Sequence, residues 1–169
     1  MNLIAAFFFV HSLGTAQYNA ESDAMSFKQE ISVTAATRDS IVDFAKTFLG
    51  TPYKYAHASP NSGFDCSGFT WFVYNHFGVA IPRSSQDYMT LGTRVTLETC
   101  KKGDLILFTG TDPAEKRVGH VGIIISEAGD SVKFIHSSSS ENHFGVTITD
   151  YYESAYPKRF IGVCSVLPE

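Results

Sequence analysis

The sequence lacks several features by which large classes of protein are identified. It contains no apolar run of the roughly 18 residues that a membrane-spanning helix needs, so no transmembrane segment is expected. Its cationic residues form no block longer than the pairs Lys101-Lys102 and Lys158-Arg159, and the formal net charge is -4. Because nucleic-acid binding relies on clustered positive charge, we expect no nucleic acid among its partners.

Common metal and redox motifs are also missing. There is no H-E-x-x-H or H-x-H, and none of the three cysteines, Cys66, Cys100 and Cys164, forms a C-x-x-C pair. A zinc ribbon and a thioredoxin-like site are therefore not supported. Two arrangements of the thiols remain open, a bridge between Cys100 and Cys164 or three free thiols.

The composition is that of a folded domain with an unusual beginning. With 169 residues, of which 44% are hydrophobic and 18% charged, the chain can bury a sizeable single core. Residues 1–16 contain the apolar block L-I-A-A-F-F-F-V, followed by small residues at the spacing of a cleavage site, and resemble a secretory signal peptide that carries no Lys or Arg. The alternative is a packed N-terminal strand or helix. We expect export to the periplasm or the extracellular space, a linker over 17–37 and one folded domain over 38–169.

Helical patterns occupy the first half of the expected domain. Apolar residues recur at helical spacing over 38–49 and predict a first helix. Asp65 is suited to cap a second helix, in which Cys66 shares an apolar face with positions 69, 73 and 77. Residues 52–65 read as a loop, and a short third helix is expected over 84–91.

Beyond residue 95 the pattern changes to short β-branched or aromatic runs separated by turn residues. Helices followed by strands predict an α+β fold with an antiparallel sheet. The expected strands are 105–108, 120–125, 132–136, 145–148 and 159–166.

The second and third of these strands are joined by S-E-A-G-D, residues 126–130. A hairpin centred on Ala128 would place His120 directly opposite His136, with Gly122 on the same face leaving open space beside the two rings. A slip of one residue would send the histidines to opposite faces.

A thiol at a helix start and two adjacent imidazoles suggest nucleophilic catalysis. The helix N-terminus and an imidazolium on His120 would stabilise the thiolate of Cys66, and His120 would later protonate the leaving amine. His136 would fix the tautomer of His120, and backbone N–H groups would bind the oxyanion. Asp65 opposes this, since a nearby carboxylate raises a thiol's pKa. A structural cysteine, packed histidines and a metal site remain open alternatives.

Six blocks occur in order along the chain and carry a family resemblance. Together they resemble the NlpC-type bacterial cell-wall cysteine peptidases. That resemblance implies a papain-like α+β fold in which N-terminal helices pack on a central antiparallel sheet. The blocks are L-G-T-P-Y-K-Y (49–55), G-F-D-C-S-G-F (63–69), I-P-R-S-S (81–85), K-G-D-L-I-L-F (102–108), G-H-V-G-I (119–123) and F-I-H (134–136).

The resemblance also implies roles for single residues. It makes Cys66 the nucleophile, His120 the general base and His136 the orienting third member. It implies hydrolysis of amide bonds in peptidoglycan stem peptides or muropeptides, between γ-D-glutamyl and a diamino acid, with no metal or cofactor. The alternatives are an amidase, a transpeptidase or an acyltransferase on the same scaffold, or a catalytically silent wall-binding module.

Three further residues would contact the substrate by the same resemblance. Tyr53 would support the oxyanion or bind substrate, and Asp65 and Ser67 would hold the free amino end of the peptide. One departure lies nearby, because Ala56-His57 stand where family members often have Gly-Gly. Tyr55 is therefore a possible replacement for Tyr53.

Overall fold

The computed structural model describes residues 38–112, 114–141 and 144–168. The signal peptide expected over 1–16 and the linker expected over 17–37 lie outside the described residues and stay predictions. In the described ranges, no helix combines the length and the apolar character required to cross a membrane.

Two α-helices precede the sheet, as expected. The first helix, α2, ends three residues earlier than predicted, because residues 47–50 form a series of turns instead. The helix α3 begins at Cys66, where the capping pattern placed it. The predicted third helix is present in 3₁₀ form as η1. The helical segments are α2 (Arg38–Lys46), α3 (Cys66–His76), η1 (Ser85–Thr90) and η3 (Tyr156–Arg159).

Six strands form an antiparallel sheet in the order β3-β8-β4-β5-β6-β7, and all five expected strands are among them. The sequence did not predict β3 or the small separate ladder of β1 and β2. The bounds are β1 (Ala58–Ser59), β2 (Gly63–Phe64), β3 (Thr93–Val95), β4 (Leu105–Phe108), β5 (His120–Ile124), β6 (Lys133–Ser138), β7 (Gly145–Asp150) and β8 (Phe160–Ser165).

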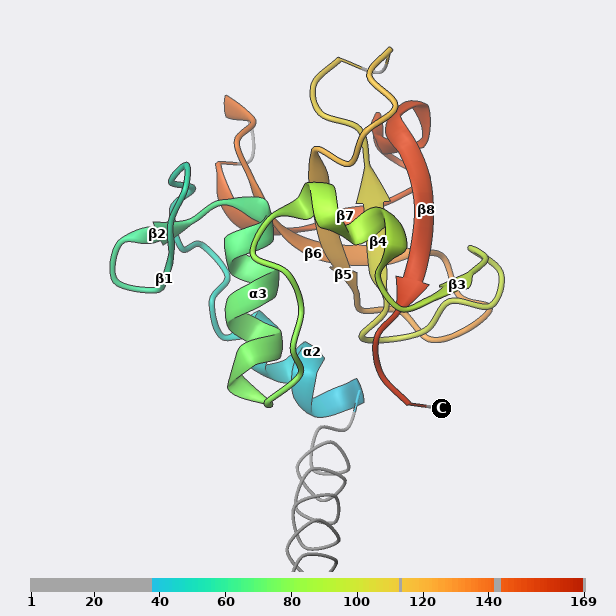
Figure 1. Ribbon diagram of the computed structural model, residues 1–169, viewed down its shortest axis with the longest axis horizontal. Coiled ribbons are helices and arrows are strands. Elements are labelled where there is room, and N and C mark those ends of the chain that lie inside the picture. The colour runs from blue at the N-terminus through green and yellow to red at the C-terminus, as the bar shows by residue number, and fades with distance from the viewer. Residues whose placement is uncertain (1–37, 113, 142–143, 169) are drawn as a thin grey trace, which may run out of the picture. The chain divides into compact units, whose positions relative to one another are not determined.

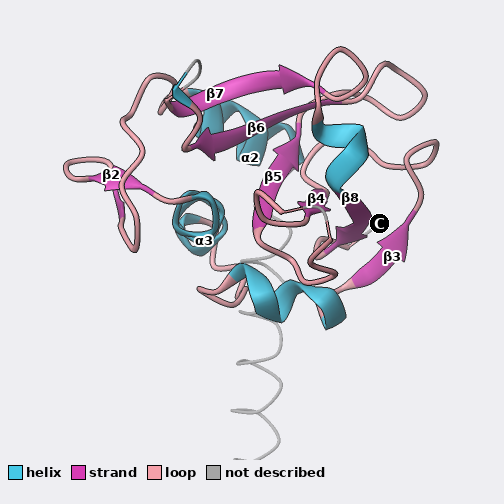
Figure 2. Cartoon of the chain, turned by 90° about the horizontal axis from the view of Figure 1, so that it is seen from above, coloured by secondary structure: helices cyan, strands magenta, loops and turns pink. Residues whose placement is uncertain are grey.

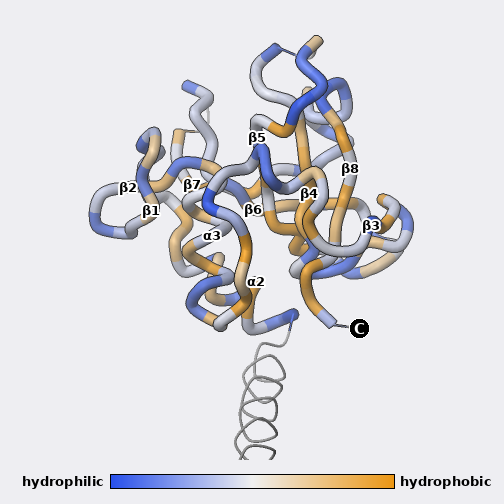
Figure 3. The backbone as a smooth tube through the Cα atoms, viewed as in Figure 1, coloured by the Kyte–Doolittle hydropathy of each residue, from blue (hydrophilic) through white to orange (hydrophobic). Residues whose placement is uncertain are grey.

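The sheet separates two apolar clusters. Because side chains alternate between the faces of a strand, Leu105 and Leu107 pack towards α2 and α3, whereas Ile106 and Phe108 pack on the opposite face. Both helices lie on one side of the sheet (Figure 1), and α3 is seen end-on beside it from above (Figure 2). Hydrophobic residues are concentrated along the central strands (Figure 3). This arrangement confirms the predicted α+β class.

The β5–β6 hairpin has a different register from the predicted one. Ile123 pairs with Ile135 and Ile124 with Phe134, so the pairing is displaced by two residues. The tight turn is closed by a hydrogen bond from Asp130 N to Glu127 O at 3.2 Å, and the chain runs on before β6 begins. The prediction that His120 stands directly opposite His136 is therefore wrong.

The displacement by two preserves the face on which each side chain lies. His120 and His136 remain on the same face, as diagonal rather than direct neighbours. The predicted open space beside Gly122 is absent, because a Cβ there would lie only 2.5 Å from Cδ2 of Phe134. The ring of Phe134 fills this space.

All three cysteines are free thiols. Cys100 is buried in the cluster on one face of the sheet and Cys164 in the cluster on the other, so the sheet stands between them. The possible bridge between these two residues is not formed.

A buried ion pair fastens α2 to the sheet. Arg38 Nη1 donates to Asp104 Oδ1 at 2.8 Å and to Lys102 O at 2.7 Å, while its Nη2 donates to Ser165 Oγ at 3.0 Å. The Asp104 side chain is 1% exposed. A nearby exposed pair has the same length, since Lys102 Nζ lies 2.8 Å from Asp39 Oδ1, but the Asp39 side chain is 71% exposed.

These two carboxylates allow a matched stability test. Asp104→Ala leaves the Arg38 guanidinium without its ionic partner, and we expect it to lower the free energy of unfolding by about 3 kcal/mol. Asp39→Ala should lower it by less than about 1 kcal/mol, because water screens the exposed pair. Urea denaturation followed by circular dichroism measures both. Equal losses would contradict the role given to Asp104.

Candidate active site

The start of α3 is built around Asp65. Its Oδ1 accepts a hydrogen bond from Gly68 N at 2.6 Å, which confirms the predicted N-cap. Position 68 must be glycine, because a Cβ there would lie 2.2 Å from His57 O and 2.9 Å from Arg83 Nη2. The G-F-D-C-S-G-F block thus lets a loop and an arginine approach the helix start closely.

Arg83 binds the two residues on either side of Cys66, a contact that the sequence did not predict. Its Nη1 lies 2.9 Å from Asp65 Oδ1 and its Nη2 lies 2.8 Å from Asp65 Oδ2, a two-point ion pair. Nη1 also donates to Ser67 Oγ at 3.1 Å. Arg83 belongs to the I-P-R-S-S block, and that block was the available signal for a partner of Asp65.

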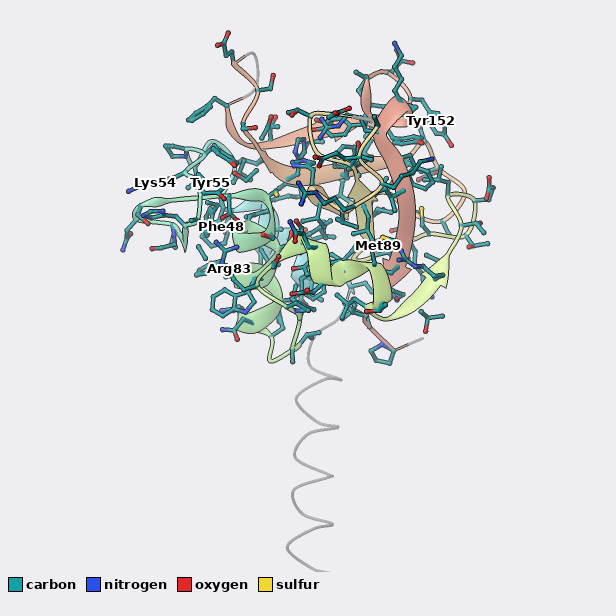
Figure 4. The ribbon with its side chains drawn as sticks, turned by 45° about the horizontal axis from the view of Figure 1, so that its top comes forward. Phe48, Lys54, Tyr55, Arg83, Met89 and Tyr152 are labelled. Carbon is teal, nitrogen blue, oxygen red and sulfur yellow. The ribbon has the colours of Figure 1, made fainter. Side chains whose placement is uncertain are left out.

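A cavity of about 490 Å³ opens around Cys66. Tyr53 and Tyr55 both line it, with Asp65 and Ser67, so the fold brings together all the predicted substrate-contacting residues. Tyr53 is half-buried, whereas Tyr55 is 80% exposed. In Figure 4, Tyr55 projects from the segment that precedes β1 and Arg83 lies nearer to α3.

The loop that carries these tyrosines contains the departure noted above. Ala56 adopts φ 58°, in the left-handed region that favours glycine. The chain therefore keeps a glycine-type conformation at this position even though the residue is alanine. The backbone of Tyr53 is held by an isolated parallel β-bridge to Phe64.

The thiol of Cys66 faces the start of β5. Its Sγ lies 3.9 Å from the carbonyl oxygen of Gly119, the residue before His120. Burial first, and then the Asp65 carboxylate, raise the pKa of Cys66 to about 11. Backbone N–H groups of Cys66, Ser67 and Val121 act in the opposite direction without offsetting this rise.

The two histidines meet on the face of the sheet that also carries Phe108 and Phe134. His120 Nε2 lies 2.9 Å from His136 Nδ1, and the side chains are almost entirely buried. The predicted meeting of the rings is confirmed despite the shifted register. His136 Nε2 in turn lies 2.9 Å from Thr149 Oγ1 on β7, a partner that the sequence did not indicate.

Tyr156 covers this pair from η3. Its hydroxyl lies 3.3 Å from His120 Nε2, and its ring stacks on His120 with centroids 5.5 Å apart. Arg159 lies over the Tyr156 ring, with Cζ 5.2 Å from the centroid. No motif marks Tyr156, because only the folded chain brings η3 beside β5.

Burial determines the resting charge of the site. It lowers the pKa of His120 well below 6.5, and His136 and Arg159 lower it further. With the pKa of Cys66 at about 11, the resting pair at pH 7 is a neutral thiol and a neutral imidazole. Both pKa shifts oppose the expected thiolate–imidazolium pair in the unliganded site, because a charge there is desolvated more than it is compensated.

Comparison with known proteins identifies relatives of this chain. The gamma-D-glutamyl-L-lysine dipeptidyl-peptidase of Bacillus cereus strain ATCC 10987 is 32% identical over 155 residues, which are 92% of this chain and 44% of that protein. The gamma-DL-glutamyl hydrolase of Bacillus subtilis strain 168 is 35% identical over 134 residues, 76% of this chain and 30% of that protein. The chain thus spans less than half the length of these curated relatives.

A solved structure and a family model also match this chain. The crystal structure of an NlpC/P60 family protein from Bacillus cereus ATCC 10987 matches with a TM-score of 0.69 and 37% identity, covering 79% of this chain and 41% of that one. The model of the NlpC/P60 family matches residues 50–165, a segment that includes Cys66, His120 and His136. The chain belongs to the NlpC/P60 family.

Proposed function

We propose that this chain is a cysteine peptidase that hydrolyses the amide bond between γ-D-glutamyl and a diamino acid in peptidoglycan stem peptides. The observation that carries this proposal is the thiol at the start of α3, whose Sγ lies 3.9 Å from the carbonyl oxygen of Gly119, the residue directly before His120 of the hydrogen-bonded His120–His136 pair. The names of two relatives, both of which act on glutamyl bonds, support the substrate class. The signal-like residues 1–16 and the location of peptidoglycan support the proposal that the chain acts outside the cytoplasmic membrane.

We assign to His120 the tautomer with hydrogen on Nε2, one of the two directions in which the hydrogen-bond chain can run. If His136 Nε2–H donates to Thr149 Oγ1, then His136 Nδ1 accepts a proton from His120 Nε2–H. His120 Nδ1 then carries a lone pair and can accept the proton of Cys66. The reverse direction would leave a hydrogen on His120 Nδ1 and disable the base.

The reaction begins when the γ-glutamyl carbonyl enters the cavity at Cys66. The thiol proton passes to His120 as Sγ forms a bond to the carbonyl carbon, and backbone N–H groups at the start of α3 bind the developing oxyanion. His120 returns the proton to the leaving nitrogen and the C–N bond breaks. A water molecule, deprotonated by His120, then hydrolyses the thioester and restores the thiol.

The cavity around Cys66 offers charges that suit the acyl part of this substrate. A γ-linked glutamyl residue keeps a free α-carboxylate, and Arg83, which lines the cavity, is proposed to attract it electrostatically, since its Nη atoms already donate to Asp65, Ser67 and His57. Asp65 and Ser67, held by Arg83, are proposed to contact the amino end of the peptide, and the Tyr53 hydroxyl to contact the substrate or its oxyanion.

Replacing the nucleophile tests the proposed activity. Wild type should cleave a defined muropeptide at the γ-D-glutamyl bond, and Cys66→Ala should lower the rate by at least about 10³-fold, because the covalent route is lost. Mass spectrometry of the products measures both and separates hydrolysis from amidase cleavage at another bond or transfer to an amine. An unchanged substrate with wild type would favour a silent wall-binding module.

The resting charge predicts a pH dependence for alkylation of Cys66. Only the thiolate reacts, and a pKa of about 11 means that the thiolate fraction rises with pH. The rate with iodoacetamide should therefore increase about tenfold per pH unit between pH 7 and 10. Intact-protein mass spectrometry follows the adduct, with Cys66→Ala as the control for Cys100 and Cys164. A constant rate below pH 8 would instead indicate an ion pair.

Variants of Thr149 test the hydrogen-bond chain that is proposed to fix the tautomer of His120. Thr149→Val removes the acceptor for His136 Nε2–H with little change in volume, and we expect kcat to fall at least about tenfold. Thr149→Ser keeps the hydroxyl and should retain most of the activity. Equal thermal stability of the two variants would show that the difference lies in catalysis. Unchanged kcat in Thr149→Val would exclude this role.

A further inference from the structure

Phe144 is an exposed aromatic residue that the reaction proposed above does not use. It directly precedes β7, and its side chain is 58% exposed. Its ring packs edge-on against the ring of Tyr53, with the two centroids 5.8 Å apart. Tyr53 lines the cavity around Cys66, whereas Phe144 does not. Phe144 therefore supports one wall of this cavity from outside.

The start of β7 is fixed against the loop that precedes β1. Gly50 N donates to Val146 O at 2.9 Å, and Val146 N donates to Thr51 O at 2.8 Å. Gly145 adopts φ 111°, and a Cβ at this position would lie 2.5 Å from Thr51 O, so the close approach requires glycine. The backbone on both sides thus holds Phe144 beside the loop.

The side chain of Tyr53 has no polar contact that fixes its direction. Its hydroxyl forms no hydrogen bond with any residue that the structure describes. Burial raises the pKa of Tyr53, and the thiolate form of Cys66 and the Asp65 carboxylate raise it further, which indicates that the hydroxyl lies near the nucleophile. Among the described aromatic rings, only that of Phe144 packs against the Tyr53 ring.

We propose that Phe144 is a positioning residue, which acts in the reaction by holding the Tyr53 hydroxyl at the cavity, where it contacts the substrate or its oxyanion. A half-buried ring without a hydrogen bond can occupy several rotamers, and packing against a fixed neighbour restricts them. This inference rests on the proposed peptidase activity and on the role proposed for Tyr53.

A double-mutant cycle isolates this role. Tyr53→Phe removes the hydroxyl, Phe144→Ala removes the supporting ring, and a third variant carries both changes. With the defined muropeptide as substrate, Phe144→Ala should lower kcat/KM about 2- to 10-fold, the range expected for an aromatic pair. It should act on the same parameter, kcat or KM, as Tyr53→Phe. In the Tyr53→Phe background it should have little further effect, because the hydroxyl that it positions is absent.

Two control variants test whether the contact itself matters. Tyr152→Ala removes a ring that is also 58% exposed but packs against Tyr151 instead of the cavity wall, and it should keep wild-type kinetics. Phe144→Tyr keeps the ring and should keep most of the activity. Thermal melting followed by circular dichroism should give similar midpoints for wild type, Phe144→Ala and Tyr152→Ala, because both rings are largely exposed.

The cycle distinguishes positioning from direct contact with the substrate. An undiminished effect of Phe144→Ala in the Tyr53→Phe background would overturn the inference and would indicate that Phe144 contacts the substrate itself. Wild-type kinetics in Phe144→Ala or in Tyr53→Phe would also overturn it, as would a Phe144→Tyr variant as slow as Phe144→Ala. A muropeptide left uncleaved by wild type would instead contradict the proposed peptidase activity.

Discussion

The hydrogen bond between His120 Nε2 and His136 Nδ1 is the interaction on which the rest of the site depends. It joins β5 to β6 through side chains, continues to Thr149 on β7, and is covered by Tyr156 from η3. Because both rings are buried, each nitrogen needs a defined partner. In the proposed tautomer, these partners occupy Nε2 of His120 and leave its Nδ1 as the base for the thiol proton.

Burial also explains why the site rests uncharged. The start of a helix stabilises a nearby anion by about 0.3–1 kcal/mol, and this does not prevent the pKa of Cys66 from rising to about 11. Asp65 adds to the rise, although Arg83 binds both of its oxygens. In the proposed reaction, proton transfer from the thiol to His120 is therefore coupled to attack on a bound carbonyl, where the developing charge moves to the oxyanion and meets backbone N–H groups.

Some of this site was predictable because its causes are local, or because they depend only on whether a strand register is displaced by an even or an odd number of residues. The cap at Asp65 and the helix after it follow from nearby residues, and His120 and His136 share a face in any register displaced by an even number. The true register was not predictable, because the turn closes over 127–130 and the loop continues before β6. Arg83, Thr149, Tyr156 and Arg159 come from other segments, and only tertiary folding brings them to the site.

The protonation state of His120 is the most direct test of this account. ¹⁵N NMR of the histidine side chains distinguishes the two neutral tautomers from the imidazolium, and a His120→Gln variant assigns the signals. At pH 7 and in the absence of substrate, His120 should be neutral, with hydrogen on Nε2 and a lone pair on Nδ1. An imidazolium at this pH, or a neutral ring with hydrogen on Nδ1, would contradict the account.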